Sequence, residues 1–133
     1  MEIKIGIVGA RVRDKYHDFQ KLVDYLENLL EKIEGDGNTY SFVSGGCSKG
    51  GDRFAEIIAS DLNIPIKIFY PVVNKEHTKN EYAAACSKRN ILIAENSDEL
   101  IALTDPNALN KKGGTNQTVR VFQQLHKKKA IIL

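Results

Sequence analysis

The fold class is decided by residues 40–62, which read YSFVSGGCSKGGDRFAEIIASDL. Residues 40–44 are a short, mostly apolar run, typical of a buried strand. Residues 45–51 are rich in glycine, and the residues after them predict an amphipathic helix that ends near Asn63-Ile64-Pro65. The inward face of that helix is expected to carry Phe54, Ala55, Ile57, Ile58 and Leu62. A strand that passes through a glycine loop into a helix is the repeating unit of an α/β fold.

The same alternation extends along the rest of the chain. We expect further strands at residues 3–8, 66–70, 99–104 and 130–133. We expect further helices at about residues 14–34, 80–94 and 115–126, the last of which would bury Val119, Phe122 and Leu125. Strict alternation implies right-handed crossovers and a mainly parallel sheet. The prediction is a single domain over residues 1–133, a Rossmann-like three-layer α/β/α sandwich around a five-stranded sheet.

Composition narrows the class of protein. The 133 residues are enough for one hydrophobic core, and 42% hydrophobic with 27% charged residues excludes a disordered chain or a disulfide scaffold. The 19 Lys and Arg residues nearly balance the 17 Asp and Glu residues, so the net charge of +2 gives no general attraction to nucleic acid or to a membrane. Only two cysteines, no signal peptide and no apolar run of membrane-spanning length favour a cytoplasmic protein.

Unusual residues concentrate where the expected strands end. In a parallel sheet, ligands bind outside the carboxyl ends of the strands. Gly9-Ala10-Arg11 follows the first strand, and residues 111–116 follow the fourth. Residues 44–53 begin at the last residue of the second strand and continue through the loop after it. Two of these glycine loops open into helices, whose N-terminal N–H groups attract phosphate, and Arg11 and Arg89 could add charge. The alternative is that the glycines only serve tight turns.

Searches for specific motifs exclude several common sites. The chain has neither the GxxxxGK[ST] motif of P-loop ATPases nor the GxGxxG motif of dinucleotide-binding dehydrogenases. Cys47 lies near a helix start, which could activate its thiol, but a small buried turn residue is the simpler interpretation. His17, His77 and His126 do not have metal-ligand spacing, so no metal site is expected.

The loops resemble those of one known family. Residues 44–56, SGGCSKGGDRFAE, are similar to the "GGAxGxDRxAE" stretch of the SLOG superfamily, especially its small single-domain branch related to YspA and YpsA. Further similarities, in the same order, are Gly9-Ala10-Arg11 to "GSR", Lys88-Arg89-Asn90 to "RN", and Gly113-Gly114-Thr115 with Val119-Arg120 to "GT…R". The resemblance covers nearly the whole chain and implies a Rossmann-like domain that binds nucleotides or NAD- or ADP-ribose-like molecules.

The leading hypothesis is a binding protein for such a phosphorylated ligand, acting as sensor, carrier or sequestering protein, with no further cofactor. Backbone amides of the glycines would hold phosphate, the arginines would supply charge, and polar side chains would bind sugar or phosphate oxygens; Asp52 could instead cap its helix. The expected ligand-binding residues are Gly9, Arg11, Ser44, Gly45, Gly46, Gly50, Asp52, Arg89, Gly113, Gly114, Thr115 and Asn116.

The resemblance also implies alternatives. The superfamily includes the LOG phosphoribohydrolases, which release the base from a nucleoside monophosphate, and Arg89 resembles their arginine. Asn116 and Gln117 stand where those enzymes carry a glutamate, so Glu81 or Asp52 would have to substitute, which favours binding over hydrolysis. A DNA-associated module like DprA is disfavoured by the near-neutral charge. A homodimer is expected from the resemblance alone.

Overall fold

The computed structural model describes all residues, 1–133. Its elements alternate along the chain, with one extra 3₁₀ turn, η1. In order they are β1 (Glu2–Gly9), α1 (Tyr16–Gly35), β2 (Thr39–Ser44), α2 (Gly51–Leu62), β3 (Ile66–Ile68), α3 (Lys79–Glu95), β4 (Glu99–Leu103), η1 (Pro106–Ala108), α4 (Gly114–His126) and β5 (Ile131–Ile132). The expected alternation of five strands and four helices is confirmed.

The five strands form one sheet in the order β3-β2-β1-β4-β5, and every neighbouring pair is parallel. In the centre, Ile5 of β1 pairs with Phe42 of β2, and Ile7 of β1 pairs with Ile101 of β4. The chain first builds the sheet outward from β1 to β3, then returns to build it in the opposite direction from β4 to β5. The order therefore reverses between β1 and β4, as in a Rossmann-like sandwich, and the predicted fold class is confirmed.

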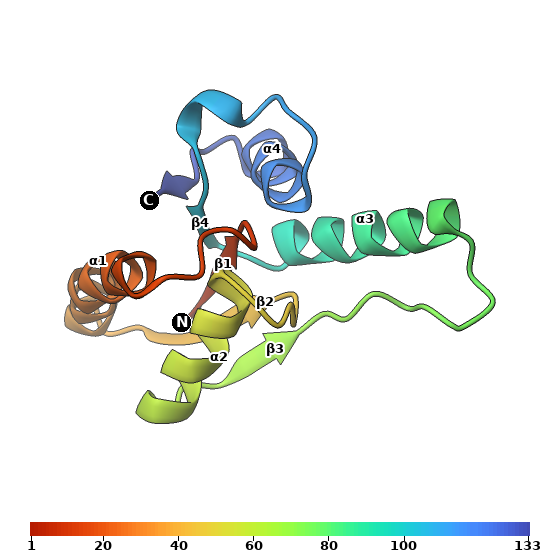
Figure 1. Ribbon diagram of the computed structural model, residues 1–133. Helices are drawn as coiled ribbons and strands as arrows, with labels where there is room; N and C mark the ends of the chain where they lie inside the picture. The colour runs from red at the N-terminus through yellow and green to blue at the C-terminus, as the bar shows by residue number, and fades with distance from the viewer.

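Each face of the sheet is covered by two helices (Figure 1). Leucines at spacings of four give α1 one apolar stripe, which packs with α2 on one face of the sheet. The larger core contains Leu22, Leu26, Leu30, Phe42 and Phe54. The second core, under α3 and α4, includes Ile93, Leu100, Val119 and Phe122. No helix is both long enough and apolar enough to cross a membrane.

Two predicted core residues were wrong, and two strands are shorter than expected. Leu62 is exposed at the end of α2, because the chain turns at Asn63 and Ile64 takes the buried position instead. Leu125 is also exposed, and at this end of α4 the ring of His126 packs on Phe122 instead, with 4.7 Å between centroids. The third strand ends at Ile68 rather than at residue 70, and β5 has only two residues.

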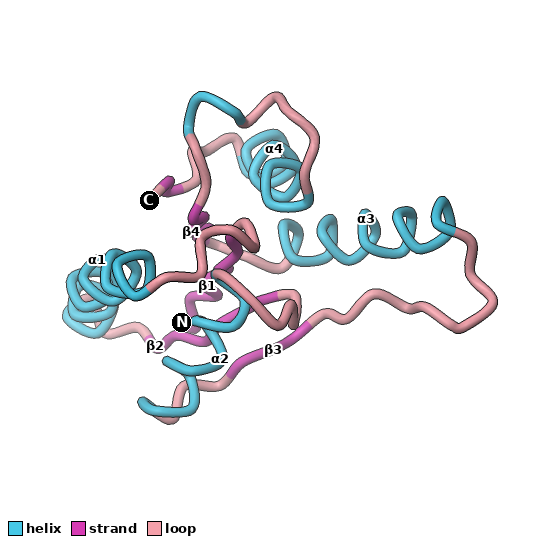
Figure 2. Tube along the Cα trace, in the orientation of Figure 1, coloured by secondary structure: helices cyan, strands magenta, loops and turns pink.

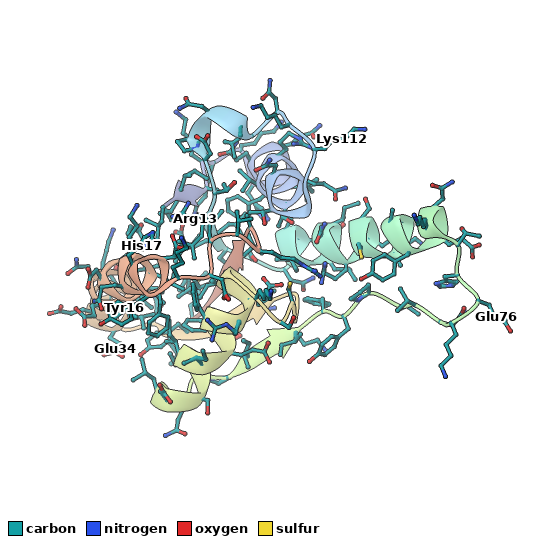
Figure 3. All side chains as sticks on the ribbon, in the orientation of Figure 1. Arg13, Tyr16, His17, Glu34, Glu76 and Lys112 are labelled. Carbon is teal, nitrogen blue, oxygen red and sulfur yellow. The ribbon has the colours of Figure 1, made fainter.

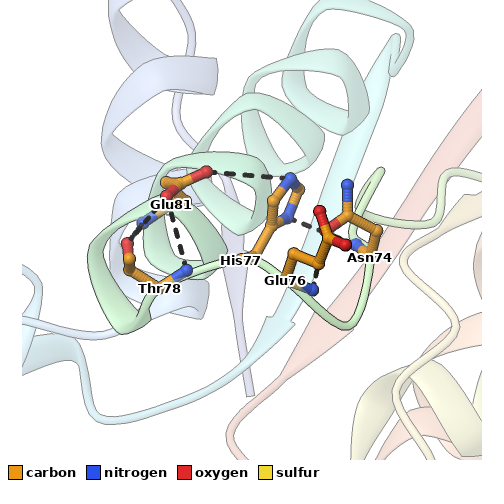
Figure 4. Close-up of polar contacts among 5 residues, drawn as sticks. All are labelled: Asn74, Glu76, His77, Thr78 and Glu81. Atoms are coloured by element: carbon orange, nitrogen blue, oxygen red, sulfur yellow. Dashed lines mark hydrogen bonds and ion pairs between the residues drawn. The ribbon is translucent and has the colours of Figure 1, made fainter.

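The outer half of α3 extends beyond the sheet, as the traces in Figures 1 and 2 show. Its first six residues, 79–84, are all exposed. The helix start is fixed locally (Figure 4), because Thr78 Oγ1 accepts the Glu81 N–H at 3.1 Å and Glu81 Oε1 accepts the Thr78 N–H at 3.4 Å. Just before it, His77 Nδ1 accepts the Asn74 N–H at 3.3 Å. This capping box starts α3 without support from the core.

Candidate ligand-binding site

A cavity of about 580 Å³ lies at the carboxyl edge of the sheet, bordered by the loops after β1 and β2, by α3 and by the start of α4. Its lining includes eight of the twelve residues expected from the sequence: Gly9, Arg11, Gly45, Gly46, Asp52, Arg89, Gly114 and Thr115. The structure therefore gathers segments from across the chain at the point where ligands bind in open α/β sheets.

The other four expected residues do not line this cavity, and three of them instead hold the surrounding loops together. The buried Ser44 hydroxyl donates to the Ile7 carbonyl at 2.6 Å and lies 3.0 Å from Asp52 Oδ1. Asn116 donates to the Ala108 carbonyl at 2.9 Å and accepts the Thr104 hydroxyl at 3.0 Å. Gly50 packs against the backbone of the β1–α1 loop, and Gly113 lines a smaller neighbouring hollow.

The loop after β2 presents its backbone to the cavity. Gly46 has φ +72°, and a Cβ at this position would overlap the ring of Tyr70, so only glycine fits here. The N–H of Cys47 donates to Asp52 Oδ2 at 3.0 Å, whereas those of Gly45, Gly46 and Ser48 donate to no protein acceptor. Successive free N–H groups of this kind form a concave site for an anion.

The start of α4 provides a second set of free N–H groups. Gly113, with φ +138°, precedes the helix, and no side chain caps it. Gly114 and Thr115 line the cavity, and neither N–H donates to a protein acceptor. The positive end of the α4 dipole therefore lies at the cavity wall.

The start of α2 is partly occupied by the protein's own carboxylate. Asp14 Oδ1 accepts the Gly50 N–H at 2.7 Å and the Arg53 Nε–H at 3.0 Å. The hydrogen bond from Gly50 is the main reason that the pKa of Asp14 lies below its usual value; burial opposes this shift, and Arg53 supports it. The α2 terminus therefore holds the β1–α1 loop in place.

Arg89 is the cation that is most firmly positioned at the cavity. Its Nη1 donates to the Gly45 carbonyl at 2.5 Å, and its Nε donates to Asn90 Oδ1 at 2.8 Å. Asn90 Nδ2 in turn donates to Gln117 Oε1 at 3.1 Å, which joins α3 to α4. Arg11 also lines the cavity and is exposed to solvent.

Asp52 is the only carboxylate that lines the cavity, and it is more than nine-tenths buried. Burial raises its pKa above the usual value, although the Cys47 N–H, the Ser44 hydroxyl and the charge of Arg89 oppose that shift. It stands in the first turn of α2 and holds the β2–α2 loop rather than capping the helix. Asp52 and Arg89 both lie next to Gly45, because a Cβ there would come within 3 Å of both side chains.

Several cavity residues were missed from the sequence. They include Tyr70, which follows β3, and one face of α3 formed by Tyr82, Cys86, Asn90 and Ile93. The four α3 residues are spaced four, four and three apart, a signal that was available in the sequence. Cys47 lines the cavity as well.

Comparisons of the chain with protein-family models, with curated proteins and with solved structures each gave no match.

Proposed function

We propose that this protein binds a phosphorylated nucleotide or a nucleotide-derived ligand in the cavity, as a sensor, carrier or sequestering protein. A nucleoside monophosphate and an NAD- or ADP-ribose-like molecule are the candidates. The observation that carries the proposal is the meeting of two sets of free backbone N–H groups, from the β2–α2 loop and from α4, beside Arg89. The resemblance of the same loops to the SLOG superfamily supports it.

The electrostatics of the lining favour an anion. The lining contains two arginines, Arg11 and Arg89, and one carboxyl group, that of Asp52. The raised pKa of Asp52 reduces the tendency of this group to ionise. The N-terminus of α4 adds about half a positive charge and stabilises an anion by roughly 0.3–1 kcal/mol, or about 2 kcal/mol when partly buried. A phosphate group suits this lining, since it is negatively charged and can accept hydrogen bonds from several N–H groups.

Thermal unfolding with AMP, NAD, ADP-ribose and cyclic nucleotides tests the proposal directly. A ligand at about 100 times its dissociation constant should add about 2.7 kcal/mol to the free energy of unfolding and raise the melting temperature by several degrees. If none of these ligands changes the melting temperature at millimolar concentration, the proposal is wrong.

Arg89→Gln separates specific binding from general charge effects. The loss of a charge-assisted contact to phosphate should weaken binding about 10-fold or more, measured by calorimetry. Arg120→Gln is the matched control, because Arg120 also donates to backbone carbonyls but does not line the cavity. Equal losses in the two variants would contradict a specific role for Arg89.

A second candidate is N-glycosidic hydrolysis of a nucleoside 5′-monophosphate, as in the LOG phosphoribohydrolases. It is favoured by Asp52 and Arg89, which lie close together beside Gly45 at the cavity, and by the raised pKa of Asp52, which suits an acid or base. In this reaction water adds to C1′ of the ribose while the base leaves with a proton.

Chromatography after incubation with AMP distinguishes hydrolysis from binding. If the protein is a hydrolase, free adenine should accumulate, and Asp52→Asn should stop its release while AMP binding persists. No adenine at high protein concentration would leave binding as the function.

A further inference from the structure

Two tyrosines line the cavity and remain largely exposed to solvent. Tyr70 and Tyr82 come from different elements, line the same cavity, and remain 63% and 49% exposed. The hydroxyls of Tyr16 and Tyr40 donate to Gln20 and Glu34, and Tyr25 packs against the larger core. The hydroxyls of Tyr70 and Tyr82 donate to no protein group, and neither ring belongs to a core. Large aromatic rings left exposed beside a polar cavity are typical of a binding surface.

The position of the Tyr70 ring is set by the glycine loop. Gly46 has no side chain, and a Cβ there would overlap two ring carbons, so the ring lies directly against the Gly46 backbone. The ring therefore stands beside the free N–H groups of Gly45, Gly46 and Ser48, which form the proposed phosphate site.

Tyr82 marks the outer end of the cavity face of α3. Along this face the exposed fraction falls from 49% at Tyr82 to 5% at Asn90 and 1% at Ile93. A helix rises 1.5 Å per residue, so Tyr82 and Ile93 lie about 16 Å apart along the axis. The cavity thus has an inner wall, with Asn90 and Arg89, and an aromatic mouth.

We infer that Tyr70 and Tyr82 bind the planar base of the ligand by stacking, so that the site selects base-bearing phosphates over sugar phosphates. This inference rests on the proposed function, because the phosphate would be held by the adjoining N–H groups. Stacking on tyrosine tolerates any base, since every base has a π-face. The site should therefore require a base but discriminate little among adenine, guanine and the pyrimidines.

Calorimetry with AMP and ribose 5-phosphate tests this, because the two share a phosphate and differ by the base. Tyr70→Ala and Tyr82→Ala should each weaken AMP binding about 5- to 150-fold, the range expected for one stacking contact. Both variants should leave ribose 5-phosphate binding unchanged, and the Phe variants should bind AMP like the wild type. Tyr16→Ala is the control, because Tyr16 is exposed as well, stands on α1 (Figure 3) and does not line the cavity.

A second readout follows from the composition. The chain has five tyrosines and no tryptophan, so its intrinsic fluorescence comes from tyrosine. AMP should quench that emission and ribose 5-phosphate should not, and the quenching should decrease in the Tyr70→Ala and Tyr82→Ala variants.

Four outcomes would overturn the inference. If ribose 5-phosphate binds as tightly as AMP, or if the Ala variants weaken both ligands equally, the tyrosines do not bind a base although the phosphate site stands. If the variants change the oligomeric mass in solution but not the AMP affinity, the rings belong to an interface between copies. If neither ligand nor any other nucleotide binds, both this inference and the proposed function are wrong.

Discussion

Two glycines in the β2–α2 region, Gly46 and Gly51, are required for different reasons. Gly46 leaves room for an aromatic ring at the cavity, whereas Gly51 lets α2 approach the central strand, because a Cβ there would lie 2.5 Å from the Val8 carbonyl. The sequence predicted a glycine-rich ligand loop and, as an alternative, tight turns. Gly46 borders the cavity, as expected of a ligand loop, whereas Gly51 is required by close packing on β1, which neither interpretation included. The sequence could not reveal that packing because β1 is distant along the chain.

Gly51→Ala should destabilise the protein, because α2 could no longer lie as close to β1. The added methyl group would press on backbone, which cannot rotate away, so the free energy of unfolding should fall by about 1–3 kcal/mol. Gly35→Ala is the matched control, because nothing lies within 4 Å of its added Cβ; it should change stability by about 0.5 kcal/mol or less. Urea unfolding measures both, and equal stabilities would contradict the close packing of α2 on β1.

At the scale of elements, the β1–α1 loop is held by carboxylates that the sequence did not single out. Asp14 joins it to the start of α2, and Asp18 accepts Arg13 Nε–H at 2.6 Å. Periodicity located α1 to within two residues at its start and one at its end, because its leucine stripe is regular. It could not locate these polar contacts, since Asp14 and Gly50 are 36 residues apart.

The Asp14 contact should make stability depend on pH in one direction. Its pKa is lowered below 3.8 in the folded protein, so ionised Asp14 stabilises the fold above that pH, and this contribution is lost as the pH falls through the folded-state pKa. The Asp14→Asn variant lacks this stabilising contribution at every pH. The wild type should therefore be the more stable protein at pH 6, and the difference should shrink below pH 3.8.

Urea unfolding of the wild type and Asp14→Asn across the acid range measures this dependence. Arg53→Gln, which removes one partner of Asp14, should give an intermediate dependence. A stability difference between wild type and Asp14→Asn that is the same at every pH would show that the charge of Asp14 does not matter.

On the scale of the whole molecule, one sheet supports two cores. Residues of β4 alternate between them, with Ile101 and Leu103 on the α1–α2 side and Leu100 and Ala102 on the α3–α4 side. Alternating strands and helices predicted the sandwich. The strand order was not part of that prediction, because sequence periodicity does not say which strands are neighbours. The spacing along α3 indicates a face that contains Tyr82 and Cys86, but without the strand order the sequence could not place that face at the cavity.

Because the cores share strands, damage to either should destabilise the whole domain. Leu22→Ala, in the first core, should cost about 2–5 kcal/mol, and Phe122→Ala, in the second, about 3–5 kcal/mol. Far-UV circular dichroism and tyrosine fluorescence should report the same urea midpoint for each variant. Two separated midpoints in Phe122→Ala would mean that the faces unfold independently.

The central position of β1 has a consequence for synthesis. Ile5 pairs with Phe42 on one side, but its other partner, Glu99, is 94 residues further along the chain. At about 5–20 residues per second, the ribosome needs about 5–20 s to make that stretch. During this time β1, whose residues Ile5 to Val8 are all buried in the folded protein, can have a neighbour on one edge only. The strand that is translated first is thus exposed longest, and nascent chains that end before β4 should be the form most prone to aggregate.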